Sequence, residues 1–216
     1  MFQASLTLRR RWLGVLVLTS AALWLPGCST VIMESAKKTL EDRSTEDQVT
    51  DTKISAAILS GLSSKDKNLL LDINVDTWEQ RVMLTGTVAD NRTRQEVVQL
   101  ARADRRVKAV YDEIQVVSAA EQARRREASK TKDSSQKEGI DRSVNDFWIE
   151  TKISAKLIAD TDVASVNYRW RSVRNTVYLI GRARSGAEYR DVVNTMLTTE
   201  GVRSVKPFVD VRPVAK

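Results

Sequence analysis

The chain repeats itself, and this internal repeat limits its possible folds more than any other feature of the sequence. Residues 51–58 (DTKISAAI) recur as residues 150–157 (ETKISAKL), an offset of 99. Two later landmarks recur at an offset of 95: residues 82–86 (VMLTG) as 177–181 (VYLIG), and residues 107–110 (VKAV) as 202–205 (VRSV). The sequence therefore predicts two copies of one unit of about 70 residues, each with a small core. The change of offset predicts a second copy that has lost four residues between its first helix and first strand.

Within each copy the spacing of apolar residues changes from a helical period to an alternating one. The expected helical stripes are Ile54, Ala57 and Ile58 in the first copy, and Ile149, Ile153 and Leu157 in the second. Ile73 and Val75, like Tyr168 and Trp170, alternate with polar neighbours, as is typical of half-buried strands. Helices are expected at residues 47–60, 91–104, 146–159 and 186–199, second strands at 82–88 and 177–183, and third strands at 110–117 and 205–211. The order αββαβ predicts an α+β fold in which a three-stranded mixed sheet packs on two helices.

Together these landmarks resemble one known family. A helix with TKIxAxL, two strands ending in V-x-L-x-G, an amphipathic helix and a G-V-x-x-V step before the last strand are similar to the BON domain. The resemblance covers residues 46–118 and 143–213 and implies two BON domains. The chain departs from the pattern at Arg106, where the second copy has Gly201, and in both hairpin turns, which lack the usual glycine.

The N-terminal residues are laid out like a bacterial lipoprotein signal. Arginines 9–11 precede a mostly apolar run over residues 12–25, which is short for a membrane span of about 20 residues. The run leads to Cys28, the only cysteine, and this resemblance implies cleavage after residue 27 and acyl chains, palmitate included, with diacylglycerol on Cys28. The alternative is an ordinary signal peptide with an incidental cysteine. Export by either the Sec or the Tat route fits the arginines.

The resemblance to lipoproteins also implies a destination. Ser29, which follows the cysteine, is not the aspartate that marks retention in the inner membrane of enterobacteria. We therefore expect the protein at the outer membrane, facing the periplasm, with residues 28–45 as a flexible lipidated tether.

Composition removes most classes of catalyst. The chain has no histidine and no second cysteine, which excludes Ser-His-Asp and Cys-His chemistry, an intramolecular disulfide and the usual zinc ligands. Neither a GxxxxGK[ST] loop nor a GxGxxG loop is present. The sequence thus predicts a protein that is not an enzyme, with no metal and no cofactor apart from the lipid on Cys28.

The two copies and the segment between them differ in charge. Residues 119–142 are charged and poor in apolar residues, which predicts a linker with some transient helix near its start. Residues 124–126 (RRR) in that segment are candidates for binding phosphate head groups, but a solvated linker is the favoured interpretation because the segment is only +2 overall. The first copy (46–118) has a net charge of −2 and the second (143–216) of +4. This contrast makes the second copy the candidate for an anionic partner.

The first helix of the second copy has apolar residues on the side away from its core stripe. On a helical wheel, Phe147, Trp148 and Ala155 project there together with Val144 and Ile158. Lys152 and Lys156 lie at the edge of this patch, which suits anionic phospholipid. The chain is also similar to the DolP-like outer-membrane lipoproteins, whose second BON domain engages anionic phospholipid through an aromatic residue near the start of its first helix. This resemblance implies that role for Trp148. The alternative is that Phe147 and Trp148 pack between the two domains.

Other residues form weaker candidate sites. Period-two alternation places four arginines on the open face of the second sheet, as a possible secondary basic surface or an ordinary solvated face: Arg169, Arg171, Arg182 and Arg184. Trp78, at a hairpin tip, is expected either to wedge into membrane or to lie over a neighbouring loop. Gly86 and Gly181 are expected to be strand-end positions with no room for a side chain.

The leading function at this stage is a non-enzymatic outer-membrane lipoprotein that binds anionic phospholipid and supports the integrity of the cell envelope. The alternative is a periplasmic adaptor that brings envelope assembly proteins together. A nucleic-acid partner is not expected for an exported protein, and the sequence leaves the oligomeric state and the orientation of the two domains open.

Overall fold

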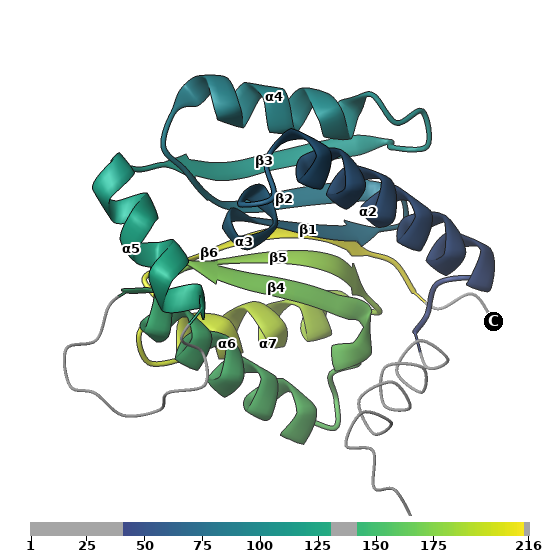
Figure 1. Cartoon of the computed structure of the whole chain (residues 1–216). Helices are drawn as coiled ribbons and strands as arrows, with labels where there is room; N and C mark the ends of the chain where they lie inside the picture. Colours follow the sequence, from purple (N-terminus) through teal and green to yellow (C-terminus); the bar gives the residue numbers. More distant parts are fainter. Residues whose placement is uncertain (1–40, 131–141, 214–216) are drawn as a thin grey trace, which may run out of the picture.

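The structure, a computed structural model, describes residues 41–130 and 142–213, and its two halves pack through their sheets (Figure 1). The first half comprises α2 (Thr45–Lys65), α3 (Leu69–Asp72), β1 (Ile73–Trp78), β2 (Arg81–Val88), α4 (Asn91–Arg102) and β3 (Ala109–Val116). The second comprises α6 (Arg142–Ala159), the short 3₁₀ helix η1 (Ser165–Asn167), β4 (Tyr168–Val173), β5 (Thr176–Ala183), α7 (Gly186–Leu197) and β6 (Ser204–Val211). Helix α5 (Ala119–Lys130) joins the halves.

Both halves have the predicted mixed sheet. The first strand runs antiparallel to the second and the third runs parallel to it, in the orders β1-β2-β3 and β4-β5-β6. Two helices cover the outer face of each sheet, so α2 and α4 lie above and α6 and α7 below the paired sheets in Figure 1. The α+β prediction is confirmed.

A buried carboxylate explains how each hairpin turns without glycine. Glu79 and Gln80 have φ of 49° and 67°, the left-handed region that a two-residue hairpin turn requires at both positions. The carboxylate of Asp51 accepts hydrogen bonds from both of their backbone amides at 2.7 Å. Asp146 does the same in the second half, accepting from the amides of residues 174 and 175 at 2.8 and 2.9 Å. These fixed hydrogen bonds offset the strain of left-handed residues with side chains.

The matching roles of Asp51 and Asp146 correct the predicted alignment of the repeat. Their separation is 95 residues, and the same offset relates the buried residues of the first helices, which are Ile54, Ile58 and Leu62 in α2 and Ile149, Ile153 and Leu157 in α6. The second copy has therefore not lost four residues. The TKISA string is displaced by four residues along its helix, close to one turn of 3.6, and such a shift keeps isoleucine on the core face. Ala57, predicted in the stripe, is exposed.

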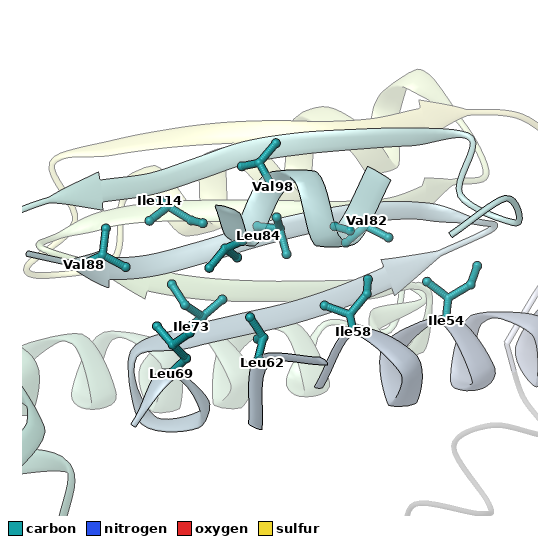
Figure 2. Close-up of a cluster of buried hydrophobic side chains, with 12 residues drawn as sticks. Ile54, Ile58, Leu62, Leu69, Ile73, Val82, Leu84, Val88, Val98 and Ile114 are labelled. Atoms are coloured by element: carbon teal, nitrogen blue, oxygen red, sulfur yellow. The ribbon is translucent and has the colours of Figure 1, made fainter. Parts of the chain in front are cut away.

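Each half has its own core between its sheet and its helices. In the first, side chains from α2, α3 and α4 meet those of all three strands (Figure 2). Gly86 lies where β2 meets the chain entering β1, and a Cβ there would be 2.0 Å from the carbonyl oxygen of Asp72. Gly181 is placed likewise, 2.2 Å from the carbonyl oxygen of Asn167. These glycines serve the close approach of two backbone segments.

A third apolar cluster lies between the sheets and joins the halves. It contains Trp78, Met83, Val173, Tyr178 and Ile180, all buried. Tyr111 and Phe208 stack at its edge with ring centroids 4.2 Å apart. Trp78, expected to touch membrane or a loop, is instead fully buried, with the Arg43 guanidinium 4.4 Å from its ring centroid. Neither sheet therefore has an open face.

The contacts between the sheets follow an approximate twofold axis. Asp76 and Arg171 occupy equivalent positions, 95 residues apart, and pair with each other at 2.9 Å. Tyr111 stacks on Phe208, and Glu113 binds Lys206. The offset of 95 makes Tyr111 equivalent to Lys206 and Glu113 equivalent to Phe208. The two contacts are therefore made by the same two positions, with the domains exchanged. Such exchange of equivalent positions defines an isologous interface. The domains pack like the subunits of a dimer.

The segments before α2 and α6 are more ordered than the sequence predicted. In the tether predicted as flexible through residue 45, Glu41 and Arg43 are buried and Asp42 binds the side chain of Asn167. The predicted linker begins with the regular helix α5, in which Gln122 is buried. The segment before α2 contacts the second half, and α5, which follows the first half, also contacts the second half through Arg125 and Asp146. A solvated tether or linker would make no such contacts. Cys28 lies outside the described residues.

Candidate functional site

Helix α6 presents an apolar ridge because its other side is used by the core. Ile149, Ile153 and Leu157 are buried under the helix, one turn apart. On the outer side Phe147 and Trp148 are 49% and 48% exposed, with their rings in an edge-to-face arrangement at 5.8 Å. The alternative expected both rings to be packed between the domains, but half of each side chain is exposed, so neither is buried there.

The ridge continues along the helix. Ala155 is exposed, and Ile158, near the end of α6, is 62% exposed. We call Phe147, Trp148, Ala155 and Ile158 the α6 ridge. Val144, also predicted there, has no described side-chain placement. Exposed apolar residues that form a continuous strip on one helix are typical of a contact surface.

Two lysines flank the ridge on the side of α7. Lys152 Nζ is 2.6 Å from a Glu200 carboxylate oxygen, and Lys156 Nζ is 3.1 Å from the Thr199 hydroxyl. The hydrogen bond from Lys152 lowers the pKa of Glu200, so this ion pair is charged at neutral pH. Because both partners are exposed, such a pair contributes little and is readily exchanged for another anion, for example a phosphate group. The structure thus brings together all five residues predicted for the primary site.

A groove of about 600 Å³ runs along the other side of the ridge, between α6 and β4. Phe147, Ala155 and Ile158 line it on the α6 side, and Glu41 lies across from them. Its floor is charged and includes Glu150, which accepts a hydrogen bond from the Ser172 amide at 2.7 Å. Burial raises the pKa of the Glu150 carboxyl above its ordinary value. The ridge therefore separates a lysine edge from a mixed-charge groove.

The four arginines predicted as a secondary basic surface are paired with acids across the domain interface. Arg171 binds Asp76 at 2.9 Å and Arg182 binds Glu79 at 3.2 Å. Arg169 and Arg184 bind Glu41 and Asp42, which lie in the segment before α2. Alternation correctly placed these arginines away from their own core, but the other domain covers that face. This prediction of an open basic surface is wrong.

The arginines of α5 are engaged as well. Arg125 binds Asp146 at 2.9 Å, and Arg126 binds Asp72 at 2.5 Å. Arg124 is exposed. Two of the three residues proposed as a phosphate-binding cluster therefore hold the fold together.

Sequence reasoning missed the interdomain ion pairs, although a signal for them existed. At an offset of 95, acidic Asp76 aligns with basic Arg171, and the opposite net charges of the halves point the same way. A charge reversal between equivalent positions of a repeat is a mark of an isologous interface. Taken from the sequence alone, the same charge difference instead predicts an external anionic partner.

Within residues 41–130 and 142–213, no helix is long and apolar enough to cross a membrane. Over the same residues, no group of three or more acidic, histidine or cysteine side chains is placed to hold a metal ion.

Comparison with known proteins identifies the class. The chain matches the BON domain family twice, over residues 47–118 and 145–213. It belongs to that family as a tandem BON protein. BON domains are generally not enzymes, and the family associates the chain with membranes and the cell envelope.

Individual relatives are distant. An Anaplasma centrale protein described as an uncharacterized protein in the gshII 5' region is 29% identical over 156 residues, covering 71% of this chain and 92% of that protein. A solved structure of CdsD, a structural protein of the type III secretion system of Chlamydia trachomatis, is 15% identical with a TM-score of 0.28, covering 72% of this chain and 90% of that one. A structure of the CdsD C-terminal domain has the same identity and TM-score, covering 79% and 100%. Similarity at this level carries no conclusion about function.

Proposed function

We propose that the protein is an outer-membrane lipoprotein, anchored through acyl chains on Cys28 and facing the periplasm, whose second BON domain binds anionic phospholipid. The observation that carries the proposal is the half-exposed aromatic pair Phe147 and Trp148 on a helix edged by Lys152 and Lys156. The resemblance to DolP-like lipoproteins supports the same helix as the phospholipid-binding site. In this role the protein supports the integrity of the cell envelope.

The chemistry of the α6 ridge suits the boundary between head groups and acyl chains. Tryptophan and phenylalanine bury apolar rings there, and an exposed lysine near an anionic leaflet contributes about 1 kcal/mol. Ala155 lies between the two aromatic residues and Ile158 along the helix, and its small side chain leaves room for the bilayer to approach the helix there. Binding of this kind is weak, which is sufficient for a protein that the lipid on Cys28 already keeps at the bilayer.

The position of the tether agrees with this arrangement. Glu41, thirteen residues after Cys28, lines the same groove as Phe147 and Ile158. A segment of that length spans at most about 45 Å when fully extended. A lipid anchor on Cys28 would therefore keep the α6 ridge close to the membrane that holds it.

Vesicle binding tests the proposal. A protein beginning at residue 29 keeps every described contact, since both cores and the interdomain ion pairs lie within residues 41–213. We expect it to co-sediment with phosphatidylglycerol vesicles more than with phosphatidylcholine vesicles, and less as salt is raised. Trp148→Ala should weaken binding several-fold, while Val211→Ala, at a surface position 48% exposed, should not.

Equal binding by wild type and Trp148→Ala would rule out the proposed site. Photocrosslinking from position 147 in cells separates lipid binding from the adaptor function. Adducts made mainly with envelope proteins rather than lipid would favour the adaptor.

A further inference from the structure

The first domain also carries an exposed apolar pair. Leu70 and Leu71 in α3 are 43% and 50% exposed, while their neighbour Leu69 is buried and supplies the contact of this short helix with the core. Packing within the domain therefore gives no reason for leucine at either exposed position. Two adjacent exposed leucines invite a search for what they contact.

Leu71 lies next to the α6 ridge. Leu71 and Phe147 line one crevice of about 150 Å³ at the seam between the domains, and Phe147 also lines the larger groove along α6. Glu41, where the described chain begins, lies on that larger groove. The tether, the ridge and α3 thus follow one edge of the molecule, the edge formed by β1 and β4.

Helix α5 fixes the two apolar pairs relative to each other. Its adjacent residues Arg125 and Arg126 bind Asp146 and Asp72. Asp146 immediately precedes Phe147, and Asp72 immediately follows Leu71. One helix therefore holds the exposed pair of each domain at a set position relative to the other.

We propose that Leu70 and Leu71 insert into the same anionic bilayer as Phe147 and Trp148, so that the membrane-contacting surface is built from both domains. This inference rests on the proposed function. A bilayer is the partner because the surface continues the α6 ridge and because the tether enters at the same edge. Arg124 on α5 is exposed and adds a positive charge next to Arg125 and Arg126, which are paired with acids. Contact at two points would fix the orientation of the protein on the membrane, which a single ridge would not.

Matched serine variants test the contribution of α3. In the protein beginning at residue 29, Leu70→Ser/Leu71→Ser should lower partitioning onto phosphatidylglycerol vesicles about tenfold. Val211→Ser changes an equally exposed side chain on β6, at the opposite edge of its sheet from β4, and should leave partitioning unchanged. Thermal unfolding without vesicles should be nearly the same for both variants, because the changed side chains are exposed.

A spectroscopic readout supports the same test. A protein that begins at residue 29 contains no cysteine, so Leu71→Cys can carry a single environment-sensitive fluorophore. Its emission should move to shorter wavelength on addition of phosphatidylglycerol vesicles, and emission from the same label at Val211→Cys should not.

The outcomes separate this inference from the proposed function. If Trp148→Ala weakens binding but the leucine variant binds like wild type, the composite surface is wrong and the α6 site stands. If neither change affects binding, both are wrong. If the leucine variant loses only self-association in sedimentation equilibrium, α3 is a contact between two copies and the inference is overturned.

Discussion

The two BON domains share one backbone plan and differ in what equivalent positions do. Asp76 and Arg171 are equivalent and form an ion pair across the interface. Much of the charge difference between the copies therefore serves ion pairs between the two domains. On the first helices, the offset of 95 makes Thr52 and Lys53 equivalent to Phe147 and Trp148 of the second domain. Opposite charges at equivalent positions thus serve the pairing of the two domains, whereas the exposed aromatic pair is present on the first helix of the second domain and not on that of the first.

An isologous interface explains why the charges diverged. If two identical second domains paired in this geometry, Arg171 would face Arg171, and two first domains would place Asp76 against Asp76. Like charges facing each other disfavour both pairings. The observed charges favour the first domain with the second.

Trp78 and Val173 give the largest expected contrast, since they are equivalent positions in the same interdomain cluster. Trp78→Ala should lower the free energy of unfolding by about 3–5 kcal/mol because it leaves a large cavity between the sheets. Val173→Ala removes far less volume and should cost about 1–2 kcal/mol. Urea unfolding followed by circular dichroism measures both. Equal losses in the free energy of unfolding would show that Trp78 and Val173 contribute equally to the interdomain cluster.

Exchanging the central ion pair should give an intermediate effect. Arg171→Asp places two carboxylates together and should cost about 2 kcal/mol, less than for a fully buried pair because Arg171 is partly exposed. The double change Asp76→Arg/Arg171→Asp should restore most of that loss, measured by the same urea titration. If the double variant is no more stable than Arg171→Asp alone, charge complementarity does not hold the domains together.

The smallest effect is expected at Glu150, which is equivalent to Ser55 in the first domain. Burial raises the pKa of Glu150 above its ordinary 4.5, so the folded protein holds this proton more tightly than the unfolded chain does. Its contribution is therefore most favourable below pH 4.5 and is lost as the pH rises through the raised value. Glu150→Gln should gain stability relative to wild type between pH 4 and pH 7, followed by melting temperature. Ser55→Ala, which has no charge to titrate, should show no such trend.

Much of the fold could be predicted because local patterns report it. The stripes around Ile54 and Ile149 and the alternation at Ile73 and Tyr168 identified the helices and strands of both copies. The alignment of the helices failed because TKISA shifts by nearly one turn and keeps isoleucine inward, so the motif alone cannot report its register. The ridge residue Trp148 could be found because a helical period shows which side faces away from the core.

What the sequence by itself determined is therefore the content of each domain: two αββαβ units, the core faces of their helices and an apolar ridge on one of them. Only the tertiary structure decided which remaining faces meet water. Period-two alternation shows that Arg171 and Trp78 point away from their own cores, but it contains no information on a second sheet arriving from 95 residues away. The packing of the two sheets buried Trp78 and paired the arginines with acids, and it left the α6 ridge exposed.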